Sequence, residues 1–274
     1  MKVLPRNSRC LCLYLSLLAQ LSLLSASYAQ APALVLLIQP AQREEATRRA
    51  FQPLLGQLEQ ATGRRFVIAI APNFLAHWQT VHRNASYDLA LDEAHFTDYR
   101  VQKFGFHVLA KVPGTSSYSL ATARATQLRS PLDLAGKKVA SFGPPSIGAT
   151  RLNAMFPNPA RHPAIIEVAS ATDGLTLLKE GKVAAVMLPT AALTDEVNRD
   201  QVNVISTAEP TPNMALSISP RVDPATREKI RAALLRPGAA QSKQLREAGI
   251  DGFEPASSAQ YAGQARMLKD FWGY

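Results

Sequence analysis

The sequence predicts a two-lobed α/β protein, in which two open and mostly parallel sheets are flanked by helices and enclose a ligand cleft between the lobes. Short apolar runs alternate with segments of helical periodicity from residue 33 to residue 219. The alternation starts again after Pro113, so that the second half of the chain repeats the order of the first. Hydrophobic residues make up 47% of the chain, which is typical of a globular protein.

The first 29 residues have the features of a secretory signal peptide. Lys2, Arg6 and Arg9 precede an apolar run at residues 11–24, and small residues follow up to Ala29. The run is shorter than the roughly 20 residues of a membrane-spanning helix. We therefore expect cleavage near Ala29 and export through the inner membrane to the periplasm.

Cysteine and charge exclude several classes of function. Cys10 and Cys12, the two cysteines of the chain, both lie in the expected leader, so the exported part has no thiol for a disulfide, for catalysis or for a metal. The net charge is +9, and the basic residues are scattered among acidic ones. No arginine cluster is interleaved with aromatic residues, so we expect no nucleic-acid partner. Nothing in the sequence indicates a cofactor.

The first half of the chain predicts alternating strands and helices. Apolar side chains from Ala46 to Leu58 recur at helical spacing, and Gly63 ends that helix. The predicted strands are residues 33–38, 66–70, 89–91 and 107–112, and the helices are 42–62, 75–83 and one that begins near Ala94. Short, continuously apolar strands are typical of a sheet that is covered on both faces.

The second half repeats this pattern and ends in helices. The predicted strands are residues 118–123, 138–142, 165–168, 184–188, 202–205 and 215–219. The predicted helical segments are 131–134, one from Gly148, 171–180, 224–235, 239–248 and 259–271. We place the first lobe at residues 30–113 with 220–274 and the second at 114–219, joined near Pro113 and Pro220.

Six blocks of the sequence carry a resemblance to a known family. They are residues 51–63, 71–74, 87–90, 132–140, 181–186 and 210–233. In this order they resemble the phosphonate/phosphate-type periplasmic substrate-binding proteins of ABC transporters. The resemblance implies the type II periplasmic binding protein fold. It also implies a protein that captures a small molecule by lobe closure and delivers it to the membrane permease of an ABC transporter.

The turn after the strand at residues 138–142 is the first predicted contact with the ligand. Backbone N–H groups at the start of a helix suit an anion such as phosphate or phosphonate. The resemblance implies a Ser-Thr-Ser-Gly run here, but this chain has Ser146, Ile147 and Gly148, with Thr150 as a partial replacement for the missing hydroxyls. Alternatively, Ser146 only caps the helix.

Two further predicted contacts are less polar than the resemblance implies. Phe74 stands where the family usually has a tyrosine, and it is either a ligand contact or a core residue. Leu188 stands where the family often has an aspartate. Gln39, directly after the first predicted strand, is another predicted ligand contact. We therefore expect a more apolar pocket, and a different ligand, than in the phosphonate type.

Asp92, Glu93 and His95 stand where the family commonly has a small, neutral turn. Two carboxylates at the mouth of a cleft would repel a doubly charged phosphonate. One interpretation is that Asp92 caps the following helix with Glu93 in its first turn. The other is that a carboxylate pairs with a cationic group of the ligand. His95 is either a proton sensor or an ordinary buried histidine.

The sequence favours a binding protein over an enzyme. Ser141 and Ser146 lack the Gly-x-Ser-x-Gly context of a hydrolase nucleophile, and the histidines do not cluster as metal ligands do. The alternative to transport is a ligand sensor of the same fold that signals to a membrane receptor or histidine kinase. Ligand-stabilised closure would serve either role, so the sequence leaves both open.

Overall fold

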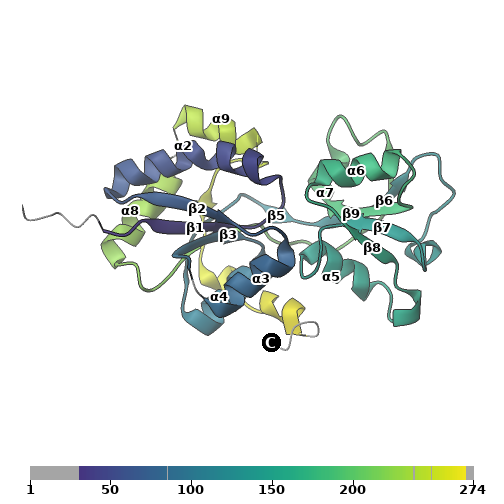
Figure 1. Ribbon diagram of the computed structural model, residues 1–274, viewed down its shortest axis with the longest axis horizontal. Coiled ribbons are helices and arrows are strands. Elements are labelled where there is room, and N and C mark those ends of the chain that lie inside the picture. The colour runs from purple at the N-terminus through teal and green to yellow at the C-terminus, as the bar shows by residue number, and fades with distance from the viewer. Residues whose placement is uncertain (1–30, 85, 237, 248, 270–274) are drawn as a thin grey trace, which may run out of the picture. The chain divides into compact units, whose positions relative to one another are not determined.

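The computed structural model describes residues 31–84, 86–236, 238–247 and 249–269 (Figure 1). The expected signal peptide, with Cys10, Cys12 and the cleavage position near Ala29, lies outside the described residues. The chain from Ala33 onward forms a compact unit. In the described part of the chain, no helix is both long and apolar enough to cross a membrane.

The first sheet contains six strands and combines parallel and antiparallel pairs. The strands are β1 (Leu34–Ile38), β2 (Phe66–Ile70), β3 (Leu89–Asp92), β4 (His107–Lys111), β12 (Ala215–Ile218) and β13 (Glu254–Pro255). Their order is β13-β4-β12-β3-β1-β2. β1 runs parallel to β2 and β3, whereas β12 is antiparallel to β3 and β4, and β13 is antiparallel to β4.

Helices cover both faces of this sheet. They are α2 (Glu44–Thr62), α3 (Phe74–Arg83), α4 (Ala94–Phe104), α8 (Pro224–Leu234) and α9 (Ala239–Glu247). Figure 1 shows α2 and α9 on one side of the sheet and α3 and α4 on the other. α2 buries Phe51, Leu54 and Leu58 against the sheet. It ends at Gly63, whose φ of 71° is left-handed and therefore suits glycine.

The second sheet contains five strands. They are β6 (Tyr118–Ala123), β7 (Lys138–Ser141), β8 (Ala164–Glu167), β9 (Ala185–Pro189) and β10 (Val202–Thr207), in the order β10-β6-β9-β7-β8. β7 is parallel to both of its neighbours, whereas β6 is antiparallel to both of its own. Three α-helices accompany this sheet, α5 (Ile147–Ala154), α6 (Ala171–Lys179) and α7 (Thr190–Thr194).

The chain passes from one sheet to the other at two places. β5 (Thr115–Ser116) lies on the way from β4 to β6, and β11 (Thr211–Pro212) lies on the way from β10 to β12. The two short strands pair with each other in antiparallel orientation. Each is only two residues long, which is too short for a hydrophobic pattern to predict.

The structure confirms the predicted α/β class with two lobes and corrects three details. The sheets are mixed rather than mostly parallel, because β6, β12 and β13 pair in antiparallel orientation. β12 hydrogen-bonds to the first sheet, so that residues 215–219 do not belong to the second lobe as predicted. The predicted helix at 259–271 is two 3₁₀ helices, Ser258–Tyr261 and Gln264–Leu268, as far as it is described. Gly263, with a φ of 84°, separates the two.

Candidate functional site

A cleft of about 970 Å³ is lined by residues from both sheets. From the side of the first sheet come the ends of β1 and β3 and the start of α2. From the side of the second sheet come the start of β6 and the starts of α5, α6 and α7. The carboxyl ends of parallel strands and the amino ends of helices thus meet there, which is the usual place for a ligand in open α/β sheets.

Hydroxyl groups and apolar side chains make up most of the cleft wall. Ser117 donates to the hydroxyl of Thr190, and the two oxygen atoms are 2.8 Å apart. Thr115, Ser116 and Thr172 also line the cleft, and the apolar part of the wall includes Phe51, Phe142, Ile147, Met214 and Ile250. Such a wall combines orienting hydrogen bonds with apolar contact, as in many small-molecule sites.

The charged side chains in the cleft are mainly acidic. Among the described lining residues, Arg43 carries the only cationic side chain, whereas Glu93, Asp173 and Glu247 carry carboxyl groups. Arg43 Nη2 lies 2.7 Å from Asp173 Oδ1. This ion pair joins the start of α2 to the first turn of α6, and its arginine side chain is 74% exposed.

The Glu93 carboxylate reaches across the cleft to the second lobe. Its Oε1 accepts a short hydrogen bond from the Tyr118 hydroxyl, and its Oε2 accepts one from the backbone N–H of Ile147 at 3.1 Å. Ile147 is the first residue of α5. Glu93 is 5% exposed, and burial raises the pKa of its carboxyl to about 7, against the lowering effect of the two hydrogen bonds.

The predicted turn at the start of α5 has a clear capping role. The Ser146 hydroxyl accepts a hydrogen bond from the N–H of Ala149 at 3.2 Å and donates one to the Phe142 carbonyl at 3.1 Å. Ile147 lines the cleft, whereas Ser146, Gly148 and Thr150 are not among the lining residues. The interpretation of Ser146 as a helix cap is therefore confirmed, and its role as a ligand contact stays a prediction.

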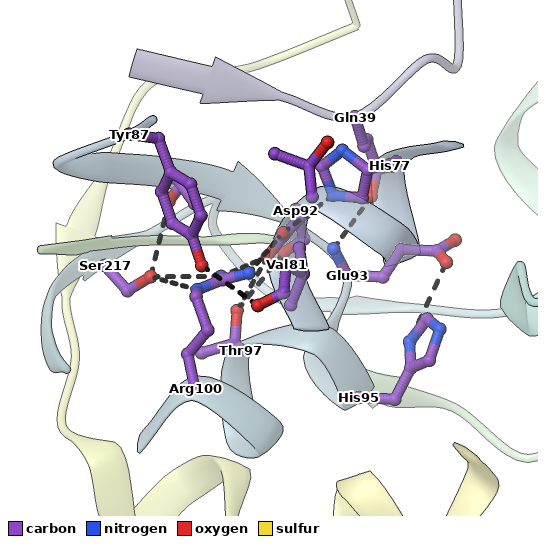
Figure 2. Close-up of polar contacts among 12 residues, drawn as sticks. Gln39, His77, Val81, Tyr87, Asp92, Glu93, His95, Thr97, Arg100 and Ser217 are labelled. Atoms are coloured by element: carbon purple, nitrogen blue, oxygen red, sulfur yellow. Dashed lines mark hydrogen bonds and ion pairs between the residues drawn. The ribbon is translucent and has the colours of Figure 1, made fainter. Parts of the chain in front are cut away.

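Asp92 belongs to a buried polar network rather than to the cleft. It forms two hydrogen bonds with the Arg100 guanidinium, at 2.6 and 2.5 Å, and a third with His77 at 2.9 Å (Figure 2). Ser217 holds the other side of Arg100, 3.0 Å from Nη2. Burial alone would raise the pKa of Asp92, but Arg100 and His77 lower it well below its usual range.

This network corrects both interpretations of Asp92. Its carboxylate is fully buried and held by Arg100, so it does not face a cationic ligand group. It does not cap α4 either, because Glu93 occupies the cap position and makes no capping hydrogen bond with its side chain. The network instead fixes the end of β3, from which Glu93 projects.

His95 is buried beside Glu93 and contacts the second lobe. Its Nε2 lies 2.8 Å from the carbonyl oxygen of Pro145, and its Nδ1 lies 3.9 Å from Glu93 Oε2 (Figure 2). Nδ1 has no hydrogen-bond partner among the described residues. Burial lowers the pKa of His95 to about 4, so the ring is neutral at neutral pH. A neutral ring that donates through Nε2 leaves Nδ1 as an acceptor.

The three remaining predicted residues have different surroundings. Gln39 lines the cleft, and its side-chain oxygen accepts the N–H of Glu93 at 2.8 Å. Phe74 is 1% exposed and stacks on Phe96 and Phe142, so it is a core residue that does not line this cleft. Leu188 is fully buried in β9 and does not line the cleft. Thr190, two residues further along the chain, does line it.

Sequence reasoning missed Arg43, Tyr118, Asp173 and Thr190. Arg43 and Asp173 lie directly at predicted helix starts, and this position was the available signal, because helix starts of open α/β folds face the ligand. Tyr118 begins the first strand after the crossing between the sheets. No cluster of three or more metal-ligating side chains occurs among the described residues.

The fold and the cleft define the class of two-lobed solute-binding proteins. Residues 36–261 match the family model for the periplasmic substrate-binding proteins of phosphonate ABC transporters. This chain belongs to that family, and it is thus a periplasmic substrate-binding protein of the phosphonate ABC transporter type. The predicted family is confirmed. No curated protein sequence is a significant match.

Solved structures agree with this assignment at the level of the fold. PhnD1 of Prochlorococcus marinus in complex with methylphosphonate superimposes with a TM-score of 0.71 at 13% identity, and the match covers 86% of this chain and 97% of that one. A binding protein component of an ABC phosphonate transporter from Pseudomonas aeruginosa gives 0.70 at 15% identity, with 86% and 85% covered. XAC2383 from Xanthomonas citri bound to ATP gives 0.67 at 17% identity, with 87% and 100% covered.

Proposed function

We propose that the cleft between the sheets binds a small solute and that the solute holds the two lobes together for delivery to the permease of an ABC transporter in the periplasm. The main support for this proposal is that residues of both sheets line the cleft. A solute in contact with both walls binds the closed form better than the open form. It therefore shifts the population toward closure.

The two crossings support such a closing motion. Between the sheets, the described chain passes only through the segments that contain β5 and β11. A few residues at the ends of elements are the usual hinges of two-lobed binding proteins. We therefore move the second predicted hinge from Pro220 to the segment around β11. Cleavage of the leader near Ala29 would release the protein into the periplasm.

The size of the cleft favours a solute larger than a simple oxyanion. Its volume of about 970 Å³ is near the upper end of the roughly 300–1,000 Å³ of small-molecule pockets. The ligands named for the similar structures range from methylphosphonate to ATP, so the fold does not select a size. In this chain we assign solute contact to the wall residues Gln39, Glu93, Tyr118, Ile147 and Thr190.

A thermal-shift screen of the exported protein tests the proposal. The panel contains phosphate, phosphonates, sulfonates, carboxylates, amino acids and polyamines. A solute at 100 times its dissociation constant adds about 2.7 kcal/mol to the free energy of unfolding, which raises the melting temperature visibly. If no compound at saturating concentration shifts the melting temperature, the proposed solute capture is wrong.

A pair of matched variants then locates the binding site. Ala191 and Ala225 are both exposed and are both the second residue of a helix, but only Ala191 lines the cleft. Ala191→Phe should weaken binding of the solute at least tenfold by filling the cleft, whereas Ala225→Phe should leave it unchanged. Equal effects of the two substitutions would place the solute elsewhere.

Uptake measurements separate transport from sensing. We expect a deletion strain to lose uptake of the solute that the screen identifies. Retained uptake together with a lost transcriptional response would support the sensor alternative.

A further inference from the structure

The strongest unassigned feature of the cleft is the pairing of its positive groups with carboxylates of the chain itself. The start of α5 contacts Glu93 through the N–H of Ile147. The first turn of α6 contains Asp173, whose Oδ2 also accepts the hydroxyl of Ser170. Arg43, the only cationic side chain among the described lining residues, pairs with Asp173.

Glu93 is the most informative of these carboxylates, because it belongs to the first lobe and contacts a helix of the second. It is followed by α4 on the first lobe, yet its carboxylate lies at the amino end of α5 on the second, where the helix dipole and the N–H of Ile147 favour an anion. The Tyr118 hydroxyl supplies a second donor to the same carboxylate. An incoming oxyanion would need these donors and would meet a buried like charge beside them.

The position of Glu93 is set by the buried residues around it. Gln39 accepts its backbone N–H, and the preceding Asp92 is held by Arg100 and His77. The Glu93 side chain is 6% exposed, so solvent does not screen its charge as it would at the surface. The carboxylate therefore cannot turn away at low cost when a ligand arrives.

We propose that Glu93 is a specificity-determining residue that takes the place of a ligand anion at the start of α5, so that the cleft excludes dianionic oxyanions and accepts a neutral, zwitterionic or cationic solute. This inference rests on the proposed function, because it names the substrate class of the same cleft. A carboxylate can accept about four hydrogen bonds, so Glu93 can still accept one from a ligand ammonium or hydroxyl group.

Calorimetric titration with methylphosphonate at pH 8 tests the inference. Wild type should bind methylphosphonate weakly. Glu93→Ala should bind it at least about 100-fold more tightly, because the variant frees the Ile147 N–H and the Tyr118 hydroxyl and removes a like charge. Glu196→Ala is the control. It removes an exposed carboxylate that does not line the cleft, and it should bind methylphosphonate as wild type does.

A second variant keeps the test valid if Glu93→Ala does not fold. Glu93→Gln removes the charge but retains an acceptor for Ile147, so we expect a smaller gain in methylphosphonate affinity of at least about tenfold. Tight binding of methylphosphonate by wild type, or no gain in a folded Glu93 variant, would overturn the inference. If the proposed function itself were wrong, wild type would instead bind no compound of the thermal-shift panel.

Discussion

Arg43 and Asp173, 130 positions apart in the sequence, form an ion pair of 2.7 Å across the cleft. The pair connects the start of α2 on the first lobe with the first turn of α6 on the second. Its arginine is mostly exposed, so the pair holds the lobes together only weakly compared with the buried contacts of Glu93 and His95.

Removal of the exposed pair should have a small effect that depends on salt. Exposed ion pairs contribute about 0.2–1 kcal/mol, so Arg43→Ala should weaken solute binding by no more than about fivefold. Calorimetric titration at low and high ionic strength measures this change. The difference between variant and wild type should shrink at high salt, and a loss of several hundredfold would show that Arg43 contacts the solute directly.

Breaking the buried Asp92–Arg100 pair should destabilise the fold strongly. Both side chains are fully buried, so Arg100→Met leaves an uncompensated carboxylate and should lower the free energy of unfolding by about 3–5 kcal/mol. Arg100→Lys should restore little, because lysine cannot reproduce the two parallel hydrogen bonds. Urea denaturation measures both variants. A loss below about 1 kcal/mol for Arg100→Met would contradict the assigned role of the network.

Glu93 and His95 should make opposite contributions to stability as the pH changes. The raised pKa of Glu93, from 4.5 to about 7, stabilises the fold below pH 4.5, and this stability is lost as the pH rises through 7. The lowered pKa of His95, from 6.5 to about 4, stabilises the fold above pH 6.5, and this stability is lost as the pH falls through 4. Each effect is about 3 kcal/mol, so they should largely cancel between pH 4.5 and 6.5.

Single substitutions should separate the two effects. In Glu93→Gln the free energy of unfolding should rise with pH across this range, and in His95→Gln it should fall. Groups that face Glu93, namely Tyr118 and His95 together with the neighbouring Asp92, are unchanged in the first variant. Urea denaturation from pH 4.5 to 7.5 provides the measurement. Identical pH dependence in the two variants would show that neither group titrates as described.

Gly148 should not tolerate replacement by a residue with a side chain, although most glycines within helices tolerate such a replacement. A Cβ there would lie 2.9 Å from the ring of Tyr118, which donates to Glu93. Gly148→Ala should therefore cost about 1–3 kcal/mol of stability. Gly56, in the exposed part of α2, has nothing within 4 Å of a Cβ, so Gly56→Ala should stabilise the protein by about 0.5–1 kcal/mol. Thermal denaturation would contradict this if the two substitutions had the same sign.

The sequence carries most of the fold because its strands are short apolar runs between clear helix signals. β1, β2 and β6 match their predicted ranges within a residue, and Gly63 ends α2 as predicted. The antiparallel pairing of β12 escaped prediction, because strand direction depends on the path of the chain and not on local pattern.

The site was harder to predict, since its main contacts join distant positions. Glu93 was selected by its place after β3, but its partner Ile147 is 54 positions away, and no pattern in the sequence connects them. Phe74 and Leu188 were selected from the resemblance and proved to be core residues. Polarity alone also could not reveal that Asp92 faces Arg100 and Glu93 faces the cleft.

Closure of the lobes on a solute can be measured directly by the distance between two spin labels. The chain contains no cysteine after Cys12, so labels can be attached at Gln52→Cys on α2 and Lys179→Cys on α6, both of which are exposed. Electron–electron double resonance should show a longer and a shorter distance without solute and a shift to the shorter one when the solute from the thermal-shift screen is added. A distance distribution that does not change at saturating solute would contradict capture by lobe closure.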